Sequence, residues 1–426
     1  MLIDNSIYVL DFVYAISEVL DLAFPSLHNH HNVVTQISYH LARRLGLSDQ
    51  QTRDIVLAAM LHDIGLLYQQ DNPEWDGSID SDSYQMERAE LGYKLLRNIE
   101  SLAKTAQIIR YYPIRYASLT TVPLGSQIIY LANYVARQIS DQQDIFLQLP
   151  SLVADVRQRQ QQFNPEVLAA FDQLVQIVFV WVEFSPSYLK HIFLQELGHG
   201  GRLVGLKALR NFAKVFAQII DARSRFTATH SSGVATVARE LTLLAGFSQR
   251  EAQLMEVAGY LHDLGKLAVP NSILENTGAL DAAERHVMRR HPYYTYRILS
   301  RISGLESIAP LAALHHERLD GHGYPFNIQG VDFSRLSQIM AVADILTALT
   351  EDRPYRLGMS KTQAIDILTR MVADGGIDAG LVHLVVQNFP RLNAKRRRAQ
   401  NAARRAYEAF CEVTSSDNTA ASLTAS

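Results

Sequence analysis

The sequence VAGYLHDLGKL, residues 257–267, decides the fold that we expect. Apolar residues with helical spacing lead directly into the adjacent pair His262 and Asp263. An imidazole and a carboxylate are costly to bury without a partner, and a metal ion supplies the compensating charge. Gly265 is expected to end the helix, which would let Lys266 fold back over the pair. The stretch predicts a helix that presents metal ligands.

Five further residues of the types that bind borderline divalent metals accompany this pair in the second half of the chain. They are His230, His291, His315, His316 and Asp344. Seven such ligands are too many for one tetrahedral zinc ion. They suit two metal ions that share a bridging carboxylate, which is a hydrolytic arrangement. Asp263 suits the bridge because it lies beside His262 at one helix end.

A lone histidine on a helix is more often packed or on the surface than a ligand, so His291 by itself indicates little. The stretch HHERLDGHGYP at residues 315–325 differs, since it follows the apolar run IAPLAAL and combines three histidines, two acids and a Gly-Tyr-Pro turn. No packing rule requires that combination. The pattern taken together therefore favours a functional site.

These motifs resemble the HD-GYP family, a branch of the HD phosphohydrolase superfamily. The resemblance covers about residues 205–395. It includes His291-Pro292, the stretch VADILTAL that contains Asp344, and RPYR at residues 353–356. It implies an all-α domain with a di-iron or di-manganese centre, iron being expected first. It also implies hydrolysis of a 3′,5′-phosphodiester in a cyclic dinucleotide, usually cyclic di-GMP.

The resemblance also implies roles for individual residues. It places His230, His262 and Asp344 on one metal, His291 and His315 on the other, Asp263 on both, and His316 as a further ligand or substrate contact. Lys266 is expected to act with Asp263 in catalysis, because an ammonium can neutralise phosphoryl charge or protonate the leaving alkoxide. Lys266, Tyr324, Arg353 and Arg356 are the expected substrate contacts, and guanidinium groups suit phosphate geometry.

Several positions depart from the family pattern. Phe226 stands where some members have a glutamate that supports a third metal, so we expect two metals. Gly233 replaces a common arginine, Thr347 a common aspartate and Asn276 a usual lysine. None of these removes a metal ligand, but they leave base specificity open. The mixed cyclic GMP–AMP molecule is therefore a competing substrate.

The first half of the chain repeats the second at a spacing of 200 positions, and this predicts two tandem HD-type helical domains. His30 matches His230, and His62-Asp63 in AAMLHDIGLL matches His262-Asp263. SQIIYLAN, ending at Asn133, matches SQIMAVAD, ending at Asp344, at a spacing of 211 (344 − 133), because the first copy is shorter in this part.

The first copy has lost most of the ligands. Arg88 stands for His291, Tyr111-Tyr112 for His315-His316, Asn133 for Asp344 and Leu66 for Lys266, and the DGHGYP loop is missing. His30, His62 and Asp63 remain, and they could still hold one metal weakly. The alternative is a fold relic kept for packing, dimerisation or regulation, with a homodimer or a protein partner bound through this copy.

Composition is that of an ordinary globular protein, with 426 residues, 48% of them hydrophobic and 19% charged. The single cysteine allows no disulfide within the chain, and the net charge of −3 gives no global reason to bind a nucleic acid duplex. The N-terminal stretch predicts an amphipathic helix and no signal peptide. LVQIVFVWVEF at residues 174–184 is too short to span a bilayer and predicts a buried helix. We expect a cytoplasmic protein that binds no membrane.

We expect a degenerate domain over residues 1–185, a connector over 186–206, a catalytic domain over 207–395, and a basic helix with a disordered tail over 396–426. The domain at 207–395 is expected to open with a helix from about Ala208 to Asp221. The basic run KRRRAQNAARRAYEAF from Lys395 is expected to be a solvated helix face, the alternative being contact with acidic partners or nucleic acid.

The pattern thus favours a metal-dependent phosphodiesterase that opens a cyclic dinucleotide to the linear form. Two alternatives stay open. One is another HD-type nucleotide phosphohydrolase, and the other is a signalling or docking module whose catalysis is incidental.

Overall fold

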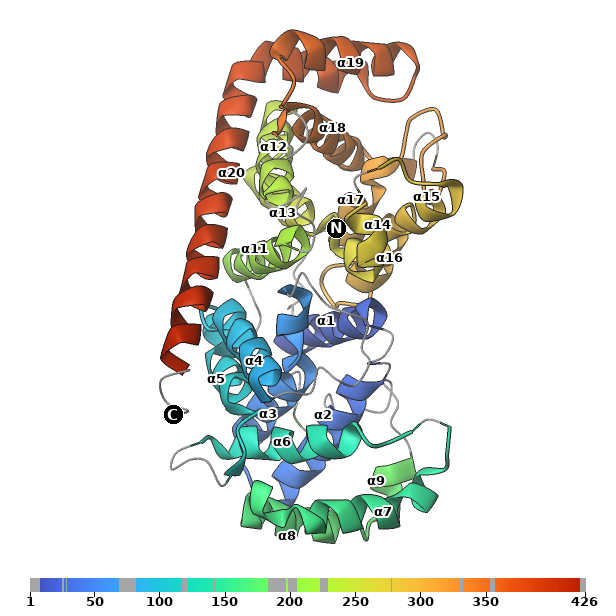
Figure 1. Cartoon of the computed structure of the whole chain (residues 1–426). Coiled ribbons are helices and arrows are strands. Elements are labelled where there is room, and N and C mark those ends of the chain that lie inside the picture. The colour runs from blue at the N-terminus through green and yellow to red at the C-terminus, as the bar shows by residue number, and fades with distance from the viewer. Residues whose placement is uncertain are drawn as a thin grey trace. The chain divides into compact units, whose positions relative to one another are not determined.

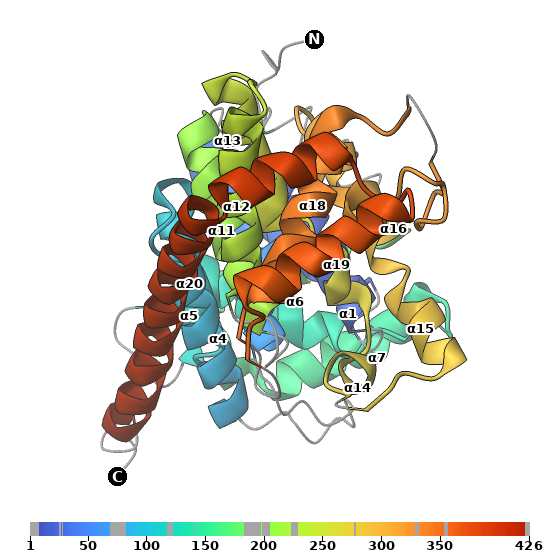
Figure 2. The same ribbon diagram turned by 90° about the horizontal axis from the view of Figure 1, so that it is seen from above.

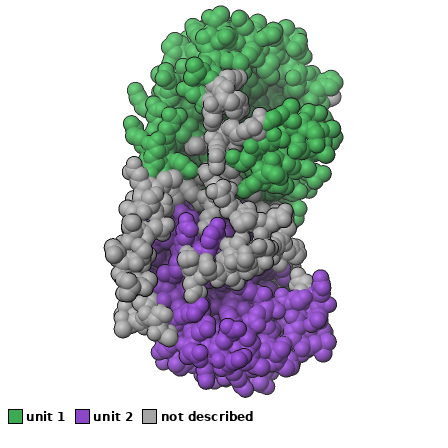
Figure 3. Space-filling model, in the orientation of Figure 1, with its two compact units in different colours: residues 1–7, 204–426 green, residues 8–203 purple. Residues whose placement is uncertain are grey.

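The computed structural model describes residues 8–24, 27, 29–68, 82–116, 122–140, 142–182, 197, 205–222, 229–276, 278–328, 332–352 and 357–421. Every regular element in this part of the chain is a helix (Figure 1), which confirms the predicted all-α fold. The chain forms two compact units, one from residues 8–203 and the other mainly from residues 204–426 (Figure 3). Within the described residues, no helix combines the length and apolarity that a bilayer crossing requires.

The first unit is built around α2, which packs against α3, α6 and α8. Val34, Ile37 and Leu41 form the fully buried side of α2. The elements of this unit are α1 (Val9–Ala23), α2 (His30–Arg44), α3 (Asp49–Leu61), η2 (Ile64–Tyr68), α4 (Asp82–Leu96), η3 (Glu100–Leu102), α5 (Ala103–Tyr111), α6 (Leu124–Ala136), α7 (Ile145–Gln158), η5 (Gln160–Gln162), α8 (Pro165–Leu174) and α9 (Val178–Val182).

The second unit is built around α12, which packs against α13, α18 and α20. The long helix α20 runs beside α12 in both ribbon views (Figures 1 and 2). The elements of this unit are α11 (Leu206–Ala222), α12 (His230–Leu244), α13 (Gln249–Leu261), η6 (Leu264–Ala268), α14 (Asn271–Leu274), α15 (Ala282–Met288), α16 (His291–Leu299), α17 (Ile308–Ala313), η7 (Leu314–His316), α18 (Arg335–Thr350), α19 (Lys361–Ala373) and α20 (Ala379–Ala421).

The two units repeat the same local structure around the His-Asp pairs. His30 and His230 are the first residues of α2 and α12. Capping boxes at Ser48 and Ser248 start α3 and α13, because each serine accepts from the backbone three residues on while a Gln or Glu side chain reaches back. Each of these helices ends just before its His-Asp pair, and a short 3-10 helix follows it. The spacing of 200 positions is therefore a spacing between equivalent structural positions.

The apolar stretch 174–184 does not form the single buried helix that the sequence predicted. Helix α8 ends at Leu174, and a turn separates it from the five-residue helix α9. Trp181 is fully buried, but Phe179 and Val182 are 57% and 64% exposed. A helix this short can turn only part of its surface toward the core, so the remaining apolar side chains face solvent.

The basic run in α20 is mostly the solvated face that the sequence predicted, since Arg397, Arg398, Arg404 and Arg405 are exposed, but its first residues make contacts within the unit. Lys395 and Arg391 lie 2.6 Å and 2.9 Å from the carboxylate of Glu240, a buried acid on α12. Arg396 is buried and donates to the backbone carbonyl of Thr350 at 2.8 Å. A buried acid needs cationic partners, and α20 supplies them. The helix continues to Ala421, beyond the start of the expected disordered tail.

Candidate metal centre

The His262-Asp263 pair lies at the end of α13, where the chain tightens into η6. We expected Gly265 to end this helix, and that expectation is wrong, since α13 stops at Leu261. The glycine is required for another reason. A Cβ at this position would lie 1.9 Å from the backbone oxygen of His291, so only glycine lets η6 approach α16 this closely.

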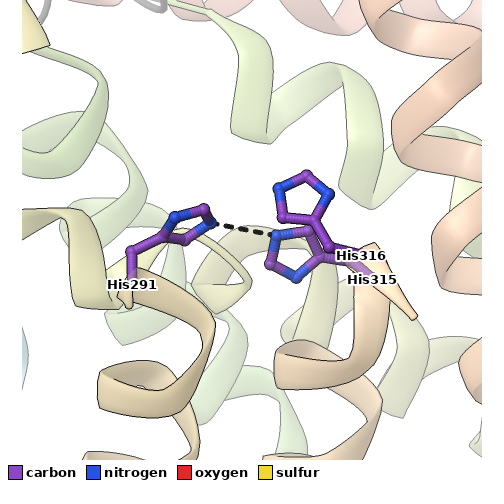
Figure 4. Close-up of side chains that lie close together, drawn as sticks. All are labelled: His291, His315 and His316. Atoms are coloured by element: carbon purple, nitrogen blue, oxygen red, sulfur yellow. Dashed lines mark hydrogen bonds between the residues drawn. The ribbon is translucent and has the colours of Figure 1, made fainter. Parts of the chain in front are cut away.

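The structure brings all seven predicted ligands together, within three overlapping groups whose ligand atoms lie within 4.8 Å of one another. The groups are His230, His262 and Asp344; His262, Asp263 and His315; and His291, His315 and His316. Figure 4 shows how the last group converges, with His291 at the start of α16 and the other two in η7. Five helices or turns far apart in the sequence thus meet at one buried centre.

Asp263 lies between two sets of imidazoles. Its Oδ2 is 3.3 Å from His262 Nε2, while its Oδ1 is 3.3 Å from His291 Nε2 and 3.8 Å from His315 Nε2. The two carboxylate oxygens therefore face different histidines. This is the arrangement that a carboxylate shared between two cations requires.

Backbone carbonyls fix the orientation of three histidine rings. Nδ1 of His262, His291 and His315 lies 2.8, 2.8 and 2.7 Å from the carbonyl oxygen three residues earlier. A carbonyl can only accept, so Nδ1 donates its proton there and Nε2 keeps a lone pair directed at the centre. Such outer contacts set the tautomer of metal-binding histidines.

His230 is oriented by an acid that the sequence reasoning missed. Its Nε2 is 3.1 Å from Asp344 Oδ1, and its Nδ1 is 3.1 Å from both carboxylate oxygens of Glu351. Glu351 follows the end of α18, is buried, and also accepts from Gln400 Nε2 of α20 at 3.1 Å. The sequence carried one signal, an acid directly behind the apolar helix that contains Asp344.

The charges of the centre stabilise one another. Burial raises the pKa of the Asp263 and Asp344 carboxyls, but nearby imidazoles lower both by more, to well below the usual range. Burial lowers the pKa of His230, and the carboxylates of Glu351 and Asp344 raise it by more, so that its pKa lies well above the usual value. Burial and then His291 lower the pKa of His316 to about 3. The centre thus offers ionised carboxylates to a cation.

Lys266 does fold back over the pair, as expected. Its Nζ lies 2.6 Å from Asp263 Oδ2, and its side chain remains 22% exposed. Burial lowers the pKa of this ammonium, and the Asp263 carboxylate raises it by more, so the pKa lies above the usual value. A charged ammonium therefore stands at the edge of the centre, partly open to solvent.

The Gly-Tyr-Pro loop is held in place by hydrogen bonds to Glu317, the acid that precedes it. The buried Glu317 carboxylate accepts from the backbone N–H groups of Phe326 at 2.7 Å and Ile328 at 3.1 Å. A Cβ on Gly323 would lie 2.5 Å from both Glu317 Cα and the Arg318 nitrogen, so only glycine allows this close approach. The loop is thereby a fixed wall of the centre.

Tyr324 in this loop contacts the centre directly. Its ring lies 4.7 Å from the His316 ring, and its N–H donates to the His316 carbonyl at 3.2 Å. The guanidinium of Arg289 lies over the Tyr324 ring, 4.5 Å from the ring centroid. Arg289 was not predicted from the sequence. It places a cation next to the expected substrate contact Tyr324.

The two departures from the family pattern at Gly233 and Thr347 are neighbours in space. A Cβ on Gly233 would lie 2.8 Å from the Thr347 methyl group and 2.9 Å from Gln400 Nε2. Small residues here therefore leave room for Gln400, which reaches Glu351. Phe226 and the predicted substrate contacts Arg353 and Arg356 lie outside the described residues.

Comparisons with known proteins agree with this geometry. Residues 214–381 and residues 28–138 each match the HD domain family. The chain is 26% identical, over 88% of its length and 90% of the other protein, to the 3′3′-cGAMP-specific phosphodiesterase 1 of Vibrio cholerae serotype O1. It is 36% identical, over 36% of its length and 41% of that protein, to the cyclic di-GMP phosphodiesterase response regulator RpfG of Xanthomonas campestris pv. campestris. The crystal structure of a cyclic GMP-AMP-specific phosphodiesterase of V. cholerae (V-cGAP3) has a similar fold, with a TM-score of 0.62 and 22% identity over 90% of this chain and 98% of that chain.

Proposed function

We propose that this chain, which contains two HD domains in tandem, hydrolyses a 3′,5′-phosphodiester bond of a bacterial cyclic dinucleotide to give the linear dinucleotide. The observation that carries this proposal is the position of Asp263, whose two carboxylate oxygens face separate sets of histidines. That geometry fits two cations. Hydrolysis of a phosphodiester requires an activated water and neutralisation of the phosphate charge, and a pair of cations can supply both.

The residues fit a pair of divalent metals by their chemistry. His230, His262 and Asp344 would hold one ion, and His291 and His315, with His316 as a further ligand, would hold the other, with Asp263 shared. When bound, two such ions lower the pKa of a water and polarise the phosphate oxygens. Imidazole and carboxylate ligands without thiolates suit iron or manganese, and we propose iron first.

The chain's own cations complete the site. Lys266 Nζ, held 2.6 Å from Asp263, is placed to neutralise charge on the phosphoryl oxygens or to protonate the leaving alkoxide. Tyr324 is placed to contact a base or a phosphate, with the Arg289 guanidinium against its ring. We also propose Arg353 and Arg356 as phosphate contacts, on the strength of the RPYR sequence.

We propose 3′,3′-cyclic GMP–AMP as the preferred substrate and cyclic di-GMP as the second. The support is that the similarity to a 3′3′-cGAMP-specific phosphodiesterase extends over both domains, whereas that to the cyclic di-GMP enzyme covers 36% of this chain. Both molecules present the same phosphates, so the bases must be distinguished outside the metal centre.

The test is product analysis with purified full-length chain loaded with Fe²⁺ without oxygen, or with Mn²⁺. Cyclic GMP–AMP, cyclic di-GMP, cyclic di-AMP and linear dinucleotides are offered separately, and products are separated by chromatography. The cyclic substrates should be opened, and Asp263→Asn should abolish this, whereas Asp366→Asn, at an exposed acid of α19, should not. Hydrolysis of linear substrates alone would favour a broader nucleotide phosphohydrolase.

A docking module is the remaining alternative. If His262→Ala with Asp263→Ala abolished turnover but left the cellular effect of the protein intact, hydrolysis would be incidental and docking would be the protein's role in the cell.

A further inference from the structure

The first unit contains a buried cluster of three histidines around one carboxylate oxygen. Asp63 Oδ2 lies 3.1 Å from His62 Nε2, 3.8 Å from His31 Nε2 and 3.9 Å from His30 Nε2. The side chains of His31 and His62 are fully buried, and those of Asp63 and His30 are 4% and 9% exposed. All four residues of the cluster come from this unit alone, so it is separate from the centre described above.

Two of these rings are held so that their free nitrogens point into the cluster. His62 Nδ1 donates to the Ala59 carbonyl at 2.8 Å, as His262 does to Gly259 in the second unit. His31 Nδ1 lies 2.6 Å from Asp21 Oδ1, an outer carboxylate of the kind that orients metal-binding histidines. The Nε2 atoms of His31 and His62 face Asp63 Oδ2, and among the described residues neither makes a hydrogen bond of good geometry.

The His31–Asp21 contact is specific to this unit. At the matching positions of the second unit, Asp221 accepts from the Ser231 hydroxyl at 2.7 Å and from its N–H at 3.2 Å. An imidazole therefore replaces a hydroxyl in the first unit. It adds one nitrogen directed at Asp63, although other ligands of this copy have been lost.

These contacts leave nitrogen lone pairs and a carboxylate oxygen facing one another in a buried space. Such an arrangement is unfavourable without a cation between the atoms. We propose that the first unit binds one divalent transition-metal ion through His30, His62 and Asp63, whose ligand atoms lie within 4.8 Å of one another, with His31 as a fourth ligand.

Arg88 and Tyr112 limit this site to one ion. Arg88 Nη1 and the Tyr112 hydroxyl lie 3.4 Å and 3.3 Å from Asp63 Oδ1, the oxygen that faces away from the histidines. A Cβ on Gly65 would lie 2.2 Å from the Arg88 backbone oxygen, and one on Gly265 would lie 1.9 Å from that of His291, so Arg88 occupies the His291 position. A guanidinium donates and cannot bind a metal, so it neutralises Oδ1 in place of a second ion.

The bound ion would stabilise this unit and would not hydrolyse a cyclic dinucleotide. Leu66 stands at the position of Lys266, and the loop equivalent to DGHGYP is absent from the sequence of the first copy. Imidazole and carboxylate ligands suit borderline metals such as Zn²⁺, Fe²⁺, Co²⁺ or Mn²⁺. Binding to the folded state alone raises stability with metal concentration.

The test is cobalt stoichiometry of the full-length chain. Chelator-treated protein is loaded with Co²⁺ and desalted, and cobalt per chain is measured together with the visible absorption spectrum. His62→Ala with Asp63→Asn should hold one cobalt fewer than the wild type and should lose the corresponding absorption bands. His40→Ala, which removes another histidine of α2, should keep the wild-type content. The difference of one ion does not depend on how many ions the second domain holds.

Asp63→Asn alone, which keeps the size of the side chain, serves where the double variant does not fold, and it too should lose one cobalt. Equal cobalt content in the wild type and a folded Asp63→Asn variant, judged by circular dichroism, would overturn the proposal. In that case the cluster is an ion-paired core in which Arg88 replaces both metals. Loss of turnover in the second domain would not by itself affect this result.

Discussion

Replacing Glu351 with glutamine is expected to weaken metal binding at His230 by about 10–100-fold, the usual effect of losing an outer partner of a metal ligand. Glu351 does not touch the predicted metal. It accepts from His230 Nδ1 through both oxygens at 3.1 Å and so keeps the Nε2 lone pair directed at the centre. A carboxylate also makes a stronger, charge-assisted hydrogen bond to the imidazole than an amide does.

The magnitude follows from the neighbours of Glu351. Gln400 donates to its Oε2 at 3.1 Å, and the orientation of Gln400 is fixed because Arg396 donates to the Gln400 oxygen. Both Glu351 oxygens lie 3.1 Å from His230 Nδ1, so a glutamine at position 351 places its NH₂ group, a donor, against the His230 N–H in either orientation. A buried donor that faces another donor in place of an acceptor costs about 1–3 kcal/mol. A 10–100-fold change in affinity is about 1.4–2.8 kcal/mol, so the two estimates agree.

The assay is competition for Mn²⁺ between the full-length protein and a chelator of known affinity. Urea denaturation of metal-free protein reports the structural part of the effect. Glu408→Gln, at an exposed acid of α20, is the matched control and should bind metal as the wild type does. Metal affinity of Glu351→Gln within about twofold of the wild type would refute the role of the acid as an orienting partner of His230.

Three further outcomes follow from the same geometry. Gly323→Ala should lower the free energy of unfolding by about 1–3 kcal/mol in urea titrations, because the new Cβ meets the backbone of Glu317; an unchanged midpoint would contradict the close approach. Lys266→Met should reduce turnover of the cyclic dinucleotide by about 10²–10³-fold while the metal content, measured by mass spectrometry, stays the same, since Lys266 supplies charge and is no ligand. Burial raises the pKa of Glu240, but Lys395 and Arg391 lower it by more, so the net pKa lies below its usual value of 4.5. The stability that the ionised Glu240 contributes is thus present above about pH 4.5 and is lost as the pH falls through the lower folded pKa. The urea midpoints of the wild type and Glu240→Gln should therefore converge in acid. A difference that stays constant with pH would contradict this role of Glu240.

The sequence predicted the fold and the kinds of ligand because these depend on local chemistry. Apolar spacing and capping residues such as Ser248 determine where helices start, and the His262-Asp263 pair marks the end of one. The repeat at 200 positions was also readable, since equivalent helices need equivalent residues. The end of α13 was placed too late, because Gly265 serves a contact with α16 that no local pattern reveals.

Contacts between distant segments were missed. Glu351 meets His230 across 121 positions, and Arg391 of α20 reaches Glu240 across 151. Nothing in the run of arginines distinguishes Arg396, which is buried, from its exposed neighbours. The interpretation of the run as a solvated face holds for its exposed arginines and is wrong for Lys395 and Arg396, because a charge pattern does not reveal their partners on other helices.

The sequence by itself determined that this chain is a helical repeat with imidazole and carboxylate groups suited to cations, because residue type and spacing are properties of the chain. Only the tertiary structure decided which atoms face one another: that Asp263 presents its oxygens to two sets of histidines, and that Asp63 presents one to histidines and the other to Arg88. The physical reason is that a ligand's direction depends on the packing of helices distant in the sequence and on the hydrogen bond made by the opposite ring nitrogen.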